Sequence, residues 1–135
     1  MGPTYINTFI AVAEDCPAEA AQVPQEKGGK PSKAAIEYRL IADNPYGLTG
    51  DEIQFRAHAL HRGIPEVDWP PERERFRPHE QPCLRASALG KRYGWGTHHS
   101  AAGRVALVPV ESERYRVMAA DPALTHLRAM RTRRA

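Results

Sequence analysis

The chain has 135 residues, 41% of them hydrophobic, and a net charge of +3, which together fit one globular domain of ordinary composition. It lacks the run of roughly 20 apolar residues that a membrane helix needs, and its start, Met1-Gly2-Pro3, lacks the pattern of a secretory signal. We therefore predict one cytoplasmic domain over residues 1–135, with no membrane contact and with too few cysteines, Cys16 and Cys83, for a disulfide scaffold.

The N-terminal part of the sequence predicts a strand, a loop and a helix. Residues Thr4–Val12 are rich in β-branched and aromatic side chains and contain no glycine or proline, which favours a strand. Residues 17–31 contain prolines and a glycine pair, which is typical of a loop. Ser32 is placed to cap a helix that continues to about Asp43, because apolar residues repeat there at i, i+4 spacing and Asn44-Pro45 stops the pattern.

The next helix has signals at both of its ends. Thr49 and Glu52 match a capping box, in which each side chain satisfies a backbone donor near the other residue. The apolar periodicity continues to about Arg62, and Gly63 supplies the left-handed conformation that commonly ends a helix. This element is the one that the sequence specifies best.

A proline-rich segment follows, over about residues 65–82. Five prolines and many charges predict a surface excursion from the domain, with one helical turn after Pro71. We expect Trp69 and Phe76 to attach it to the body of the domain, because large apolar side chains gain most from burial.

The C-terminal half predicts a β-hairpin flanked by short helices. The runs Tyr93–His99 and Arg104–Val110 are joined by residues 100–103, a connection of hairpin length. Ser87 is placed to cap a short turn before the hairpin, and Ser112 is placed to cap a helix that follows it and ends near Ala119.

Asp121-Pro122 resembles the start of a last helix, since proline is common at the first helical position. The inner edge of this helix would be Leu124, Leu127 and Met130. The elements together predict an α+β fold. It has a small antiparallel sheet that contains the hairpin and the N-terminal strand, and helices packed on one face.

The segment from residue 83 to residue 96 suggests a binding cleft for a small anion. An arginine side chain grips a carboxylate or phosphate in two places, and Gly94 and Gly96 leave one face of a strand flat enough for a ligand or a helix to approach. The predicted contacts are Arg85, Lys91, Arg92, Tyr93 and Trp95, with Lys27 and Lys30 as lid contacts. The alternative is that Tyr93 and Trp95 form a core aromatic pair and that the glycines admit a packed helix.

A second hypothesis is a thiol-dependent enzyme that uses Cys83. It requires solvent access to the sulfur and a histidine, His98 or His99, within hydrogen-bond reach, while Arg85 would favour the thiolate. The two histidines are adjacent on a predicted strand, so they point to opposite faces and cannot chelate one ion. We predict no metal site and no cofactor.

A third hypothesis, a nucleic-acid or protein interaction module, comes from the uneven charge. Residues 1–67 carry 6 basic and 9 acidic side chains, whereas residues 68–135 carry 13 and 7. Lysine and arginine drive phosphate contact, but no nucleic-acid-binding motif is present, so we do not favour this function. The alternative is that these arginines are solvated or pair with the acidic half.

Several short sequence motifs of the chain also occur together in one family. They are Thr4–Ile10 (TYINTFI), Lys27–Lys30 (KGGK), Gln81–Ser87 (QPCLRAS) and Lys91–Gly96 (KRYGWG). In these motifs, which are spread over nearly the whole chain, the protein resembles a family of small, mostly bacterial proteins whose function is unknown. The resemblance implies that these motifs are family features, and it implies no catalytic or binding residue.

Overall fold

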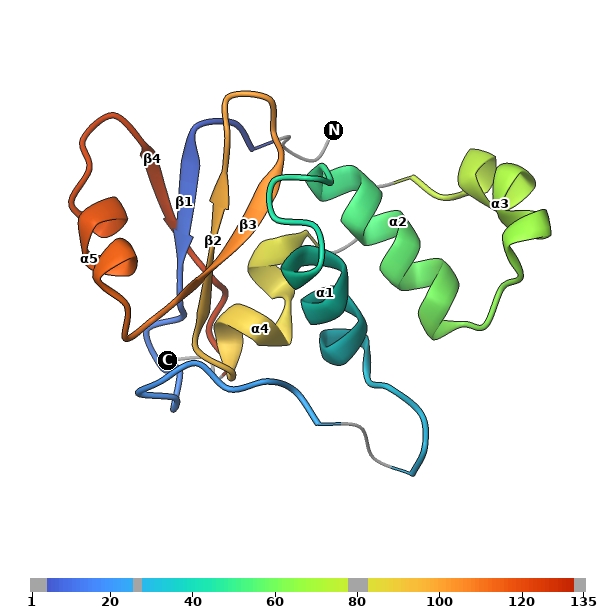
Figure 1. Ribbon diagram of the computed structural model, residues 1–135, viewed down its shortest axis with the longest axis horizontal. Coiled ribbons are helices and arrows are strands. Elements are labelled where there is room, and N and C mark those ends of the chain that lie inside the picture. The colour runs from blue at the N-terminus through green and yellow to red at the C-terminus, as the bar shows by residue number, and fades with distance from the viewer. Residues whose placement is uncertain (1–4, 26–27, 78–82, 133–135) are drawn as a thin grey trace.

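The structure is a computed structural model that describes residues 5–25, 28–77 and 83–132. Within these ranges a four-stranded sheet in the order β3-β2-β1-β4 packs against helices (Figure 1). The strands are β1 (Thr8–Ala11), β2 (Trp95–His99), β3 (Val105–Pro109) and β4 (Thr125–Arg128). The helices are α1 (Lys33–Ala42), α2 (Gly50–His61), α3 (Trp69–Arg75), α4 (Ala88–Lys91) and α5 (Glu113–Ala119). The predicted α+β class is confirmed, and none of these helices is long and apolar enough to span a bilayer.

The sheet is mostly antiparallel and has one parallel pair. β2 and β3 form the predicted hairpin, and β1 runs antiparallel to β2. The last strand, β4, runs parallel to β1, with the Thr125 amide donating to the Asn7 carbonyl and the Ala129 amide donating to the Ala11 carbonyl. The prediction of a last helix on Leu124, Leu127 and Met130 is therefore wrong. Pairing with β1 satisfies backbone groups along a strand that would otherwise be an open edge, and this outweighs the local helical spacing.

The two faces of the sheet are covered by different helices. The alternate residues Trp95, Thr97 and His99 of β2 lie on the face of the sheet that α1 and α4 cover. The predicted helix α2 packs on α1. Phe9 and Gly96 lie on the opposite face, where α5 packs. A Cβ atom on Gly96 would lie 3.0 Å from the Tyr115 ring of α5. Gly96 therefore admits a packed helix, as the alternative interpretation expects, whereas Gly94 packs against the loop at Ala18–Ala21. The expected Tyr93–Trp95 pair is replaced by a contact of Trp95 with Tyr38.

Four polar side chains cap the helices, as predicted. Ser32 caps α1, Thr49 caps α2, Ser87 caps α4 and Ser112 caps α5, each accepting from a backbone amide two or three residues further on. These caps fix the helix starts through bonds between near neighbours in the sequence. The predicted N-terminal strand is shorter than expected: β1 begins at Thr8, after Asn7 adopts a positive φ of 46°. Thr4 lies outside the described residues.

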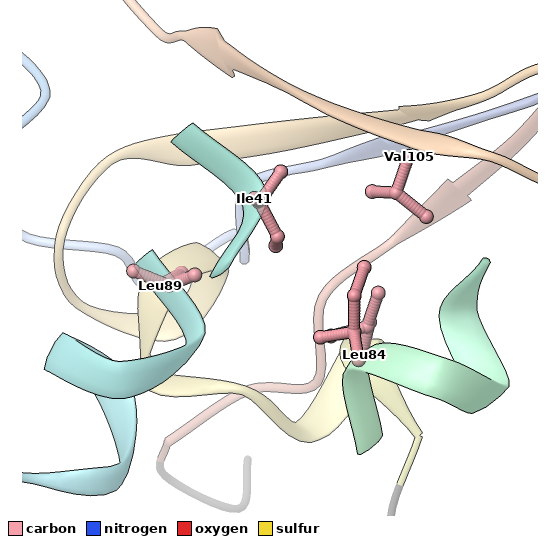
Figure 2. Close-up of a cluster of buried hydrophobic side chains, with 5 residues drawn as sticks. Ile41, Leu84, Leu89 and Val105 are labelled. Carbon is pink, nitrogen blue, oxygen red and sulfur yellow. The ribbon is translucent and has the colours of Figure 1, made fainter. Parts of the chain in front are cut away.

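A hydrophobic core joins α1, α2 and α4 to the sheet (Figure 2). Its fully or nearly buried residues are Ile41, Ile53, Leu84, Leu89 and Val105. Leu84 belongs to a 3₁₀ turn over Leu84–Ala86 that separates Cys83 from α4. Burial of this leucine holds the turn against the core, so the residues on either side of the turn are held as well.

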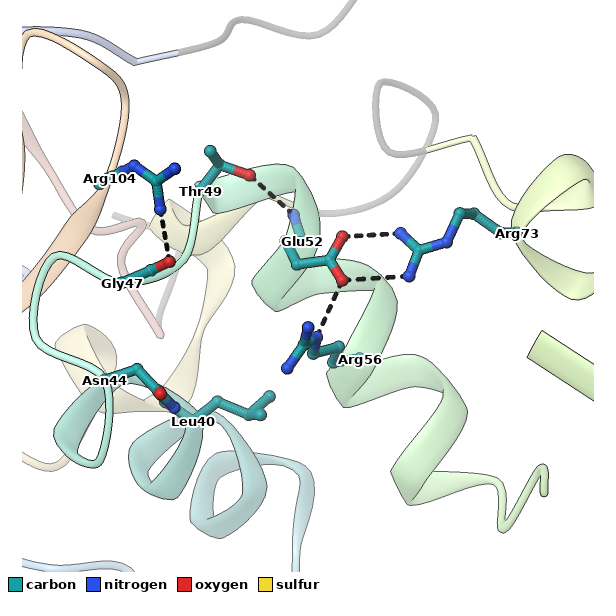
Figure 3. A network of polar contacts seen from close by, with 8 residues as sticks. All are labelled: Leu40, Asn44, Gly47, Thr49, Glu52, Arg56, Arg73 and Arg104. Atoms are coloured by element: carbon teal, nitrogen blue, oxygen red, sulfur yellow. Dashed lines mark hydrogen bonds and ion pairs between the residues drawn. The ribbon is translucent and has the colours of Figure 1, made fainter. Parts of the chain in front are cut away.

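The proline-rich segment packs on α2 through a second cluster and an ion pair. Phe76 and Trp69 pack against Phe55, as predicted, and the Trp69 indole N–H donates to the Ile64 carbonyl. Glu52 accepts two hydrogen bonds from Arg73 of α3, at 2.6 and 3.0 Å (Figure 3). The Glu52 carboxylate thus completes this attachment, while its own backbone amide donates to the capping residue of α2.

Candidate functional site around Cys83

Cys83 lies at the start of the 3₁₀ turn and is half-buried, so its sulfur is neither sealed in the core nor fully exposed. Its Sγ lies 3.2 Å from the Tyr5 hydroxyl, which comes from the segment before β1. Both cysteines of the chain are free thiols. The structure therefore brings a reactive side chain and a phenol together from positions 78 residues apart.

One cavity, of about 140 Å³, lies at the N-terminal end of α2. It is lined by Tyr5, Cys83 and His99 together with Thr49, Gly50, Asp51, Gln54, Leu84, Ala102 and Gly103. The cavity joins the segment before β1, the start of α2, the 3₁₀ turn and the hairpin, and it is large enough for a small organic molecule or a few waters.

A second cavity, of about 160 Å³, lies between α1 and α4. Its lining residues are Lys33, Ala34, Glu37, Cys83, Ala86, Ser87 and Ala88. Cys83 therefore lines both cavities.

The Tyr5 hydroxyl keeps its proton at neutral pH. Burial raises the pKa of Tyr5 to about 12, the hydrogen bond to Cys83 adds to this rise, and the neighbouring Arg85 guanidinium opposes it. Either group could donate in the contact between Tyr5 and Cys83, and a phenol that keeps its proton is able to donate it to the sulfur. Tyr5 thus takes the place beside Cys83 that the sequence hypothesis gives to a histidine.

His99 lines the first cavity as a neutral imidazole. Burial lowers the pKa of His99 to about 4, and the charge of neighbouring His98 adds to the effect. Its Nε2 lies 3.1 Å from the Thr97 hydroxyl, and its ring meets the Tyr5 ring edge-on at 5.3 Å between centroids. His98 lies on the other face of the sheet, where its Nδ1 is 2.7 Å from the Tyr46 hydroxyl. The two histidines point to opposite faces, as their adjacency on a strand predicts.

Glu37 is a buried carboxyl in the second cavity, with 6% of its surface exposed. The Ser87 hydroxyl donates to its Oε1 at 2.9 Å. Burial raises the pKa of Glu37, while the Ser87 hydrogen bond and the charge of Lys33 oppose the rise. The cavity thus contains a carboxyl group with an environment unlike that of a surface glutamate.

The residues of the predicted anion cleft make contacts in different places. Arg85 donates from Nε to the Arg128 carbonyl at 2.7 Å, and its own carbonyl accepts from the Met130 amide. These bonds hold β4 to the 3₁₀ turn. Trp95 packs its ring on Tyr38, and its indole N–H donates to a loop carbonyl, that of Gln22.

The remaining cleft residues are also spread out. Lys91 ends α4, and Arg92 borders a hollow that Asp15 and Thr132 share. The Tyr93 carbonyl accepts from the Gln22 amide, while Lys30 borders a different hollow, beside the C-terminal end of α2. Lys27 lies outside the described residues. No contact among those described joins Arg85 to Trp95, so the anion cleft stays a prediction.

Three residues of the site were not expected from the sequence as functional residues: Tyr5, Glu37 and Ser87. Ser87 gives a capping signal, and Glu37 follows Lys33 by four residues, which is typical of an exposed ion pair on a helix. Tyr5 belongs to the TYINTFI motif that the chain shares with the family it resembles, so this motif is the sequence signal that points to Tyr5.

Comparison with known proteins gives a family but no further relatives. No curated protein and no solved structure matches the chain. Among the described residues, no group of three or more histidine, cysteine, aspartate or glutamate side chains is placed to hold a metal ion. The model of one family matches residues 2–135, and the chain therefore belongs to DUF6157, a family of unknown function.

Proposed function

We propose that the protein acts on a small ligand through the thiol of Cys83. The observation that carries the proposal is that Cys83 lines two cavities and that its sulfur lies within hydrogen-bond distance of a neutral phenol. A structural cysteine packed in a core has neither access to a cavity nor a polar partner, and it is inert.

The chemistry follows from the nucleophile and its neighbours. The thiolate is the reactive form of cysteine, and it is stabilised when a hydrogen-bond donor faces the sulfur. We propose that the Tyr5 hydroxyl, 3.2 Å from the sulfur, is this donor, and that the guanidinium of Arg85 beside Tyr5 polarises the phenol further. Hydrogen bonds to charged groups contribute about 1.5–3 kcal/mol, so loss of such a bond is expected to slow a reaction at the sulfur by about tenfold or more.

The alternative proposals have less support. Binding of a small anion would need Arg85, whose side chain already donates to the Arg128 carbonyl. Binding of nucleic acid would need free arginines, whereas Arg131 pairs with Glu14 at 2.9 Å, as the charge of the two halves suggests. A titration with inorganic phosphate and a salt-dependent binding assay with nucleic acid test these two proposals.

The proposed function predicts that iodoacetamide alkylates Cys83 about tenfold faster than Cys16 at pH 7. Tyr5→Phe should slow the reaction of Cys83 by about tenfold, because it removes the hydroxyl that faces the sulfur. Both rates can be read from one sample by mass spectrometry of the two cysteine-containing peptides. Cys16 is a matched reference, since it is also half-buried.

The control substitution is Tyr93→Phe, which removes a hydroxyl from the predicted anion cleft and leaves Tyr5 in place. It should leave the rate of Cys83 unchanged. The proposal is wrong if Cys83 reacts no faster than Cys16 and is indifferent to Tyr5→Phe.

A further inference from the structure

Addition of a thiolate across a double bond also needs a group that gives a proton to the ligand. We propose that Glu37 is this acid–base residue, acting on a ligand that occupies the α1–α4 cavity beside Cys83. The inference depends on the proposed function. It assigns a role to a buried carboxyl that takes no part in the contact between the thiol and the phenol.

Burial of Glu37 is the first observation that supports this role. A carboxylate is almost never as buried as this one, 6% exposed, unless a cation or several hydrogen bonds compensate it. Among the described residues, Glu37 accepts a hydrogen bond from the neutral hydroxyl of Ser87, while Lys33 lies one helical turn away with its residue exposed. A buried carboxyl of this kind destabilises the fold when it is ionised. A role in the chemistry of the site would explain its presence.

The Ser87 hydroxyl also holds the carboxyl in one orientation. Its oxygen accepts from the Leu89 amide at the start of α4, and its hydrogen is directed to Oε1 of Glu37. Cys83 lies four residues earlier, on the other side of the turn that Leu84 holds against the core. One short, well-packed segment therefore positions both the sulfur and the serine that fixes the carboxyl.

The other titratable side chains near the sulfur are less suited to exchange a proton at neutral pH. His99 is neutral, with a pKa lowered to about 4, and Tyr5 holds its proton up to a pKa of about 12. Burial moves the pKa of Glu37 upward, toward the neutral range in which acid–base groups work best. The charged or titratable groups that share the cavity with Glu37 are Lys33 and Cys83.

The step can be written for a ligand with a carbon–carbon double bond conjugated to a carbonyl. The thiolate of Cys83 forms a bond to the terminal carbon, the π electrons of the double bond move toward the carbonyl oxygen, and Glu37 gives its proton to the resulting anion. The product is a neutral thioether, and Glu37 remains as a carboxylate. No oxidant or reductant takes part, and the reverse step returns the proton to Glu37.

Two reagents of similar size separate this role from simple thiol reactivity. Iodoacetamide forms its bond to sulfur by releasing iodide and needs no proton, whereas acrylamide needs one. In a Cys16→Ser background, Glu37→Gln should lower the rate with acrylamide by about tenfold or more and leave the rate with iodoacetamide unchanged. Glutamine keeps the size of the side chain and the acceptor for Ser87. The control is Glu113→Gln on the exposed surface of α5, which should alter neither rate.

The wild-type protein gives an independent test, which decides the matter if Glu37→Gln does not fold. The ratio of the acrylamide rate to the iodoacetamide rate cancels the titration of the thiol itself. This ratio should fall as the pH rises through the pKa of Glu37, because only the protonated carboxyl can donate. A ratio that is constant with pH and unchanged by Glu37→Gln overturns the inference and leaves the proposed function standing. If Cys83 reacts with iodoacetamide no faster than Cys16 and is indifferent to Tyr5→Phe, both fail.

Discussion

Lowering the pH from 7 to 4 is expected to remove about 3 kcal/mol of folding free energy through His99 alone. The side chain is 1% exposed, and burial lowers its pKa from 6.5 to about 4. Because the unfolded chain binds this proton more readily, the stabilisation is complete above pH 6.5 and is lost as the pH falls through 4. Each pKa unit corresponds to about 1.4 kcal/mol, so a downward shift of this size contributes about 3 kcal/mol to acid unfolding.

The measurement is urea unfolding of the wild-type protein and of His99→Gln at several pH values between 7 and 4. The variant should be less stable at pH 7, and it should lose about 3 kcal/mol less on acidification. Thr97→Val is the control, since it removes the hydroxyl that faces His99 and retains the imidazole. It should therefore keep the wild-type pH dependence. Parallel curves for wild type and His99→Gln would contradict the prediction.

Glu37 acts in the opposite direction in the same experiment. Its folded-state pKa is raised, so the folded protein binds this proton more readily than the unfolded chain. The stabilisation from Glu37 is complete below the ordinary pKa of a glutamate and is lost as the pH rises through the folded-state value. Glu37→Gln should therefore make the loss of stability on acidification steeper than in the wild-type protein.

Replacing Phe9 by alanine is expected to destabilise the protein by about 3–5 kcal/mol. Phe9 has no exposed surface, and its ring meets the Tyr115 ring of α5 edge-on, with 5.0 Å between centroids. The cavity left behind would lie beside Gly96, which has no side chain to fill it. Since domains are stable by about 5–15 kcal/mol in total, the loss should be evident as a much lower urea midpoint.

Phe76→Ala is the matched control for this prediction. Phe76 is 9% exposed and belongs to the cluster that attaches the proline-rich segment to α2, away from the sheet. Its removal should cost less than that of Phe9, because the segment can move to fill the space. Equal costs for the two variants would show that the core under the sheet is no more important than the outer cluster.

The elements that the sequence predicts well are those whose signals are local. The cap residues Ser32, Thr49, Ser87 and Ser112 bind amides two or three positions away, so a short window contains both partners. The last strand is different, because its partner β1 is more than 110 residues earlier in the chain. Leu124 and Leu127 have helical spacing, and nothing near them in the sequence shows that β1 has a free edge.

The same distinction explains the candidate site. The chemistry of cysteine is enough to name Cys83, but its partner Tyr5 is 78 residues away, and Glu37 and Ser87 are 50 residues apart. Arg85 illustrates the converse, since its charge suggests an anion contact while the structure uses it to hold the edge of β4. Residue type alone cannot distinguish a side chain that binds a ligand from one that donates a hydrogen bond to a backbone carbonyl of a neighbouring strand.

The position of β1 between β2 and β4 has a consequence for how the chain folds. Among the strands that the structure describes, β1 is synthesised before the others, yet it is an interior strand of the sheet, and both of its neighbours are synthesised later. Contacts of such long sequence separation slow folding, and the sheet is incomplete until Arg128 has been made. Until then one side of β1 is an unpaired edge, the kind of surface on which nascent chains associate with one another.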